Sequence, residues 1–132
     1  LLWNNTTIAT IGDATGLPGA ATAGSLYVTL HTATPAAGTQ ATSEATYTSY
    51  ARVAVARSSA GWTVTGGAVT NTAAVTFPTC TGGSNTITHI GVGAANAGAG
   101  LLLHSAALPA SLAVSTSVTP TFIAGSIAGT ET

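Results

Sequence analysis

The stretch LYVTLHTATPAAG, at residues 26–38, decides the fold class of this chain of 132 residues. Over residues 26–31, Leu, Val and Leu alternate with Tyr, Thr and His, which is the period of a strand with one buried face. The Thr, Pro and Gly residues that follow favour a turn. The stretch therefore predicts a strand over residues 26–31, with His31 on its polar face at the entry to a turn.

The same alternation returns at intervals along the chain. In YARVAVAR, at residues 50–57, Val53 and Val55 share one face, and Trp62 and Val64 continue the pattern after a turn. Gly and Pro recur every few residues and interrupt any long helical pattern. About eight short strands at this spacing are typical of an all-β fold, and we predict an antiparallel, jelly-roll-like β-sandwich. The further strands are expected near residues 68–70, 75–77, 87–93, 101–105, 112–114 and 118–122. Gly66 and Gly67 favour a tight reversal before residue 68, and the glycines of ITHIGVG, at residues 87–93, indicate close approach by another strand or a bulge.

The N-terminal segment lacks this alternation. Its apolar residues are not spaced as in a strand, and GLPGAATAG at residues 16–24 has the composition of a flexible connector. We predict an irregular N-terminal arm and connector over residues 1–24 and a single β-sandwich domain over residues 25–132. The chain starts at Leu1 without a methionine, so we also expect the gene product to begin earlier.

Charged residues make up only 4% of the chain, with two arginines, three carboxylates, no lysine and a net charge of −1 at pH 7. Two arginines cannot form the basic stripe that binds phosphates, so we expect no nucleic-acid partner. Designed soluble surfaces are about a quarter to a third charged. A surface this poor in charge suits contact with neighbouring protein, and we expect copies of the chain itself among its partners.

The apolar residues and the cysteine content exclude further classes of protein. Ala and Val are interrupted by Thr, Gly and Ser, and no run approaches the roughly 18 residues of a membrane span, so we expect no membrane partner. Cys80 is the only cysteine, which excludes an internal disulfide and a zinc site built on cysteines. We expect Cys80 to be a small buried thiol.

Three histidines and three carboxylates are the groups with metal-binding or acid–base chemistry. The carboxylates fall in the arm, a loop and the tail rather than beside strands, so we predict no metal site; a zinc site on the histidines is the alternative. The chain has no Gly-x-Ser-x-Gly elbow, and GVGAANAGAG at residues 91–100 lacks the Gly-Lys-Ser/Thr ending of a phosphate loop. We predict no catalytic residue, no cofactor and no enzymatic activity. The six groups are His31, His89, His104, Asp13, Glu44 and Glu131.

A carbohydrate-binding module needs only a few exposed aromatic side chains. Aromatic residues form 5% of this chain, and we expect them to pack in the core or in interfaces. A glycan platform is the alternative. The residues available for it are Trp3, Tyr27, Tyr47, Tyr50 and Trp62.

Five strings together resemble a family of small virion proteins of tailed bacteriophages, and the similarity runs roughly from residue 17 to residue 125. This chain departs from the family pattern at Thr34 before Pro35 and at Ala60 before Gly61, both in turns. The strings are LYVTLHTATPAAGTQATSEATYTSYARVAVARSSAGWTV, FPTCTGG, THIGVG, LLLHSAAL and VTPTFIAG.

The resemblance implies a non-enzymatic structural protein of a phage particle. The leading expectation is a capsid decoration or cement protein on the capsid surface, which bridges neighbouring copies of the major capsid protein. A tail-associated or tail fibre subunit is the first alternative, and a glycan-binding sandwich is the second. Leu1, Leu2 and Trp3 are the expected assembly contact, because large apolar groups on a flexible end bury well at a contact centre.

Overall fold

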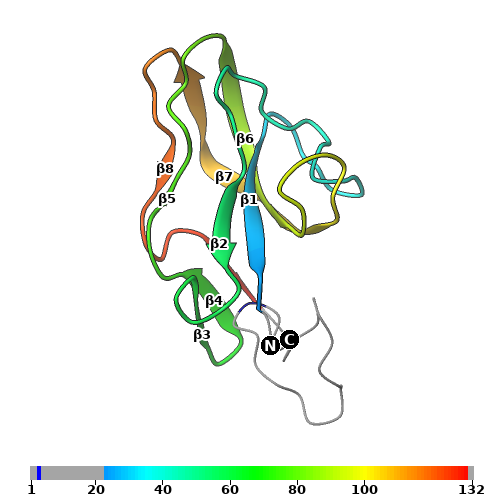
Figure 1. Cartoon of the computed structure of the whole chain (residues 1–132), viewed down its shortest axis with the longest axis vertical. Coiled ribbons are helices and arrows are strands. Elements are labelled where there is room, and N and C mark those ends of the chain that lie inside the picture. The colour runs from blue at the N-terminus through cyan, green and yellow to red at the C-terminus, as the bar shows by residue number, and fades with distance from the viewer. Residues whose placement is uncertain (1–2, 4–22, 131–132) are drawn as a thin grey trace. The chain divides into compact units, whose positions relative to one another are not determined.

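The computed structural model describes Trp3 and residues 23–130 (Figure 1). In this part of the chain there is no α-helix, and hence no helix long and apolar enough to cross a membrane. The strand pairs with a defined register are all antiparallel. The predicted all-β class is therefore confirmed. The strands are β1 (Ser25–His31), β2 (Val53–Ala56), β3 (Trp62–Thr65), β4 (Ala68–Asn71), β5 (Val75–Thr76), β6 (Ser84–Gly93), β7 (Leu102–Ser115), β8 (Thr121–Phe122) and β9 (Ala128–Thr130).

The chain divides into two compact units. Unit 1 comprises Leu1–Leu26, Val55–Val75 and Phe122–Thr132, and unit 2 comprises Tyr27–Ala54 and Thr76–Thr121. The division into an arm over residues 1–24 and a single domain over residues 25–132 stays a prediction.

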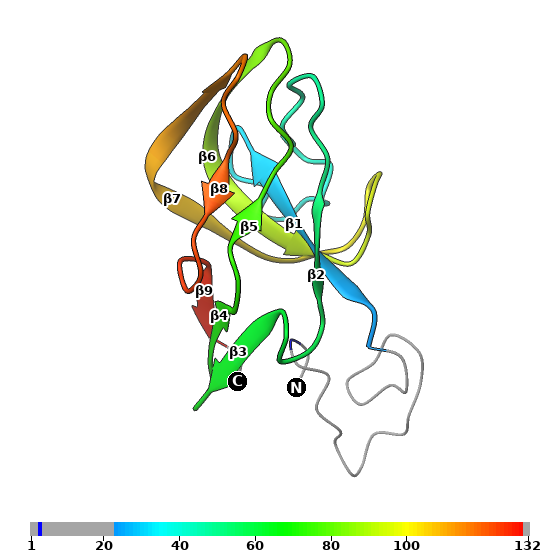
Figure 2. The same cartoon turned by 60° about the vertical axis from the view of Figure 1, so that its left-hand side comes forward.

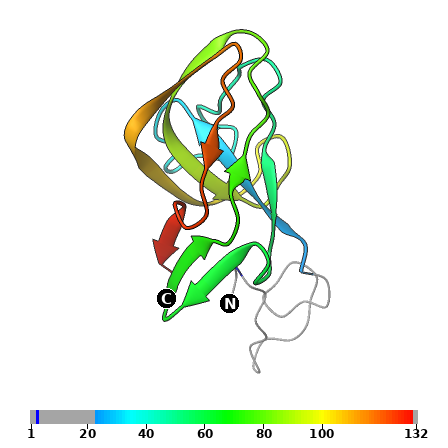
Figure 3. The same cartoon turned by 90° about the vertical axis from the view of Figure 1, so that its left-hand side faces the viewer.

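A four-stranded sheet in the order β2-β1-β6-β7, most of whose residues belong to unit 2, forms one layer of that unit (Figure 2). Residues 76–80 and 117–121 form a second layer, in front of this sheet in Figures 2 and 3. These two segments are joined by backbone bonds from Phe77 N–H to Pro120 O (2.9 Å) and from Cys80 N–H to Val118 O (2.9 Å). Two antiparallel layers with a core between them are the arrangement of a β-sandwich.

The core of unit 2 consists of inward-facing side chains from both layers. Val28 and Leu30 of β1 and Ile87 of β6 are completely buried. From the second layer, Phe77 and Cys80 are each 1% exposed. The alternation that predicted the strand at residues 26–31 therefore marks the core side of β1, as expected.

In unit 1, β3 and β4 form a hairpin, and β4 also pairs with β9. Thr65 pairs with Ala68 across Gly66 and Gly67, whose φ angles are +57° and +83°. Two central residues with positive φ make a turn whose twist matches the flanking strands, and glycine adopts this conformation without steric cost. The reversal predicted from the Gly-Gly pair is confirmed.

The longest strand differs from the prediction. Two strands were expected at residues 101–105 and 112–114, but β7 runs through both. Its register jumps from the pair Ile87 and Leu112 to the pair His89 and Ala107, which is a bulge. Pro109 lies in this bulge on a strand at the sheet's edge, where a missing backbone N–H is tolerated.

The grouping of strands also differs from the expected jelly roll, which has eight strands in two sheets. The described residues form sheets of four, three and two strands. The strand β9 of the three-stranded sheet was not predicted, because Ala128, Gly129 and Thr130 show no apolar alternation.

Candidate functional site

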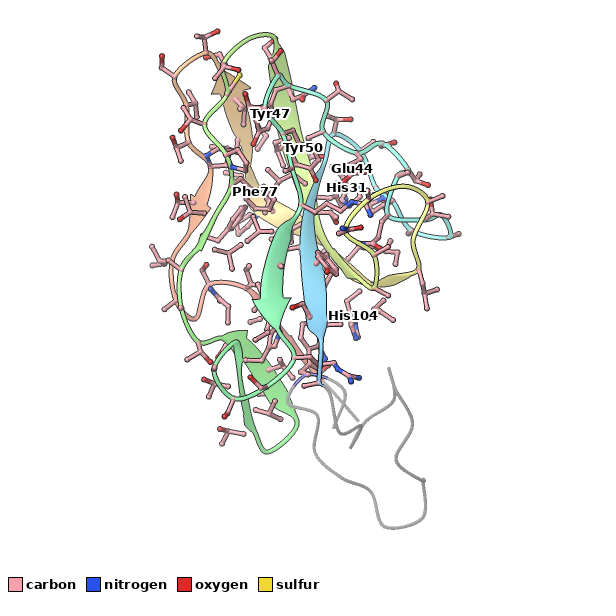
Figure 4. The ribbon with its side chains drawn as sticks, viewed as in Figure 1. His31, Glu44, Tyr47, Tyr50, Phe77 and His104 are labelled. Atoms are coloured by element: carbon pink, nitrogen blue, oxygen red, sulfur yellow. The ribbon has the colours of Figure 1, made fainter. Side chains whose placement is uncertain are left out.

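The three histidines do not converge on one point. His31 and His89 are paired residues on β1 and β6, whereas His104 is exposed on β7 opposite Val92. Figure 4 shows His31 beside Glu44, with His104 farther along the sheet. Among the described residues, no three His, Cys, Asp or Glu side chains form a group that could hold a metal ion.

His31 is completely buried, so the prediction that it lies on an exposed polar face is wrong. The physical reason is that the chain returns beside the end of β1. Ala45 N–H donates to Leu30 O at 2.8 Å, and Thr32 N–H donates to Ser43 O at 2.8 Å. The returning segment also reaches the polar face of β1 at Thr42, whose carbonyl oxygen lies 2.9 Å from His31 Nδ1, and Thr29 on the same face is also 0% exposed.

The His31 ring is fixed by two hydrogen bonds. Its Nδ1 lies 2.9 Å from Thr42 O, and its Nε2 lies 2.7 Å from Thr29 Oγ1. A carbonyl can only accept, so Nδ1 carries the proton and the Thr29 hydroxyl donates to Nε2 of the neutral ring. Burial is the main cause that lowers the pKa of His31 from its ordinary value of 6.5, which favours this neutral form.

A hydroxyl donating to an imidazole is the first pair of a nucleophilic constellation. Here both members are completely buried, and β6 closes over them at Gly91. A methyl group on Gly91 would lie 2.6 Å from Thr29 Oγ1 and 2.7 Å from His31 Nε2. The pair is therefore buried beneath the neighbouring strand, and its two hydrogen bonds fix the His31 ring to Thr29 of β1 and to the backbone at Thr42.

Glu44 corrects a second expectation. The sequence placed it in a loop away from the strands, but it forms an isolated bridge with His31 beside the end of β1. Its carboxylate binds Arg52 through two contacts of 2.7 Å, from Arg52 Nε to Oε1 and from Arg52 Nη2 to Oε2. The side chain of Arg52 is 3% exposed and that of Glu44 is 16% exposed. Because the carboxylate stabilises the guanidinium, the pKa of Arg52 is raised.

Tyr50 links the ion pair to β1 through its hydroxyl group. Its hydroxyl donates to Glu44 Oε1 at 2.9 Å and accepts from Leu30 N–H at 3.1 Å. Its ring stacks on Phe77, with the ring centres 6.2 Å apart and nearly parallel. Burial raises the pKa of Tyr50 far above its ordinary value of 10, so its hydroxyl stays protonated.

The same ion pair holds a loop at residues 94–101. Arg52 Nη1 donates to Ala95 O at 3.0 Å, and Arg52 Nη2 donates to Gly98 O at 2.6 Å. Gln40, which is completely buried, makes two hydrogen bonds to the backbone of Ala95. Gln40 Nε2 donates to Ala95 O at 3.1 Å, and Ala95 N–H donates to Gln40 Oε1 at 2.9 Å. We call Gln40, Glu44, Tyr50 and Arg52 the loop clamp, because they fix loop 94–101 and loop 32–52 to β1.

Gly93 and Gly100 make room for the loop clamp. A side chain on either residue would overlap the amide of Gln40. The prediction that the glycines of ITHIGVG mark a close approach is confirmed, since Gly93 admits Gln40 and Gly91 admits Thr29 and His31.

The aromatic side chains available for a glycan platform are turned inward. Trp3, Tyr47 and Trp62 are buried, at 5%, 3% and 1% exposure. Tyr27 is half-buried, and the half-buried Tyr50 lies in the loop clamp. None of these five residues offers the fully exposed ring that the glycan alternative requires.

The expected assembly contact is only partly described. Leu1 and Leu2 lie outside the described residues. Trp3 packs edge-to-face on Trp62 within unit 1, with the ring centres 4.2 Å apart. Contact of these residues with a neighbouring subunit stays a prediction.

Cys80 and Arg57 are both internal. Cys80 is buried and free, as predicted, and its thiol lies 3.3 Å from Gly82 O. Arg57 is 3% exposed, and its Nε donates to Ala23 O at 2.7 Å within unit 1.

All charged side chains of the described residues are therefore internal or paired. They are Glu44, Arg52 and Arg57, since Asp13 and Glu131 lie outside the described part. The surface presented by Trp3 and residues 23–130 thus carries no Lys, Arg, Asp or Glu side chain that is fully exposed. Such a surface is suited to contact with other proteins rather than to the recognition of charged ligands.

An antiparallel β-fold with a neutral surface and with its polar groups bonded internally has the features of a structural protein. The chain matches the family model described as podophage GP4 fiber I protein gp80 over residues 5–130, and it belongs to this family. It is thus a member of a family of phage virion structural proteins. A comparison with curated proteins gives no match.

Proposed function

We propose that this chain is a structural subunit of a phage tail fibre and that it acts by contact with neighbouring subunits rather than by catalysis. The proposal replaces the capsid decoration protein as the leading interpretation. The family description names a fibre protein of a podophage, and it supports the tail better than the capsid surface.

The absence of exposed charge on the described residues carries the proposal. A net charge of −1 gives a free subunit almost no colloidal repulsion, so such a surface is tolerated where neighbours cover it. Interface centres are likewise depleted in charged residues. The three described charged residues stabilise loops and strands of their own chain instead.

The loop clamp gives the subunit rigid loops, which a structural contact requires. Ala94, Asn96, Ala97 and Ala99 are exposed on loop 94–101, while the backbone beneath them is held by Arg52 and Gln40. A loop that is already ordered loses less conformational freedom when a neighbour binds. Pre-ordering of an uncharged loop therefore supports a contact surface at this end of unit 2.

Gold labelling of intact virions tests the location. Fab fragments raised against the purified chain are coupled to gold and imaged on phage particles by electron microscopy, with Fab fragments against the major capsid protein as the control. The proposal predicts gold at the tail and bare heads. Gold over the whole head surface, in the pattern of the control, would return the capsid decoration protein as the function.

We also propose that residues 1–3 contact a neighbouring subunit. Because Trp3 packs on Trp62 within its own unit, a Trp3→Ala variant tests folding and assembly together. Deletion of residues 1–2 separates the effect on assembly from the effect on folding, since it leaves the Trp3 ring in place. We expect the deletion to reduce incorporation into particles at an unchanged unfolding midpoint. Normal incorporation of the shortened chain would remove these residues from assembly.

A further inference from the structure

The free edge of the four-stranded sheet of unit 2 lies along β7. This strand has 14 residues and is last in the order β2-β1-β6-β7, with β6 as its strand partner among the described residues (Figure 2). The opposite edge is β2, which has only four residues. A long edge strand presents a row of backbone donors and acceptors to which another strand can pair.

A segment in the first half of β7 lacks the features that normally block such pairing. Natural edge strands are protected by lysines, by inward charges, by prolines or by bulges. In LLHSAALPASLAVS there is no Lys, Arg, Asp or Glu. One register shift falls between Leu102 and His104, and a second one, which contains Pro109, falls after Ala107. Residues 104–107 between the two shifts are therefore an unprotected segment, and we call them the open edge.

Apolar surface is exposed along the open edge and just before it. Leu102 and Leu103 are half-buried, and Leu101 just before them is 66% exposed. Ala106 and Ala107 are exposed as well. A strand added here would cover this apolar stripe and satisfy backbone groups at the same time.

We propose that the open edge pairs with the open edge of a second copy of this chain, antiparallel and about a twofold axis. Antiparallel pairing of a strand with itself is an isologous contact, in which both copies use the same residues and the assembly closes. Identical strands oppose like charges when they carry any, and this segment carries none. The contact joins two four-stranded sheets into one, and it does not depend on whether the particle holds the chain in its tail or its head.

A lysine at the centre of the open edge tests the proposal. Ala106→Lys places a positive charge opposite its own copy, whereas Ala54→Lys places the same charge at an exposed alanine of the β2 edge. The association of the 132-residue chain is measured by sedimentation velocity over a concentration series, and circular dichroism verifies that both variants fold. We expect Ala106→Lys to raise the dimer dissociation constant at least about tenfold and Ala54→Lys to leave it unchanged.

Each other outcome overturns the proposal. The proposal fails if the parent chain stays monomeric, and it fails if both variants still form the dimer. Loss of the dimer in Ala54→Lys alone assigns the contact to β2. Loss in both variants indicates head-to-tail pairing of β7 with β2, which builds open chains instead of closed dimers.

Cysteine scanning supplies a second readout that does not depend on charge. Ser105→Cys, Ala106→Cys and Ala107→Cys are each oxidised in the parent background, where Cys80 is buried and serves as the unreactive control. In a twofold strand pair one residue faces its own copy at about 4.5–5.5 Å between Cα atoms, which suits a disulfide. We expect dimer formation to peak at one position and to fall at its neighbours. Equal or absent crosslinking at all three positions contradicts the twofold register.

Discussion

At the scale of single residues, Arg52 makes four side-chain hydrogen bonds, more than any other residue of the loop clamp. Its guanidinium binds both oxygens of Glu44 and the carbonyl groups of Ala95 and Gly98. A buried charge that loses its partner is strongly destabilising, whereas replacing both charges with apolar groups of similar size is often tolerated. We therefore expect the loss of one charge to destabilise the chain more than the loss of both charges.

Glu44→Leu should lower the free energy of unfolding by about 3–5 kcal/mol, because it leaves the buried guanidinium without its carboxylate. The double variant Glu44→Leu, Arg52→Leu should lose less than the single one. Urea denaturation of the three proteins measures both values. A single variant as stable as the parent chain would show that the ion pair does not hold the loops.

His31 predicts a pH dependence of stability. Burial lowers the pKa of His31 in the folded chain below the unfolded value of 6.5, so the unfolded state binds more protons as the pH falls below that value. Stability is therefore fully present above about pH 6.5 and declines as the pH falls from there toward the folded pKa. Urea midpoints measured at pH 7.5 and pH 5.5 should show the decline.

The His31→Gln variant should lose most of this decline, while His104→Gln, at an exposed position, should keep it. An equal decline in the parent chain and in His31→Gln would mean that other groups determine the pH dependence.

At the scale of strands, the glycines Gly91 and Gly93 on β6 leave room for polar side chains to pack against the backbone of that strand. Gly91→Ala would bring a methyl group within 2.6 Å of Thr29 Oγ1 and 2.7 Å of His31 Nε2. We expect it to lower the free energy of unfolding by about 1–3 kcal/mol, as overpacking does in other cores. Gly129→Ala on β9 is the matched control, since nothing lies within 4 Å of its added methyl group.

Thermal unfolding measured by circular dichroism compares these two variants. A loss in Gly91→Ala that equals the loss in Gly129→Ala would show a general cost of alanine in these strands rather than a clash.

The sequence predicts the strands better than it predicts their surroundings. Alternation predicted β1, and the Gly66-Gly67 pair predicted the hairpin of β3 and β4, because both signals depend on neighbouring residues alone. The burial of His31 could not be predicted, because it depends on residues 43–45 returning beside β1. The partnership of Glu44 with Arg52 was missed for the same reason. The glycines of ITHIGVG were the available signal, since they indicated close approach without identifying Thr29, His31 and Gln40 as the groups that approach.

At the scale of the whole molecule, the composition and the structure agree. Charged residues are 4% of the chain, and those among the described residues stabilise its interior. Under the proposed function, neighbouring subunits cover the apolar and neutral surface of the chain. The family match over residues 5–130 is consistent with this account.

A cryo-electron microscopy reconstruction of the virion would show where the particle holds this chain. If the chain is a tail fibre subunit, the four-stranded sheet should fit density in the tail fibres, in contact with neighbouring subunits. Density for this sheet on the outer surface of the capsid, with none in the fibres, would contradict the proposed function.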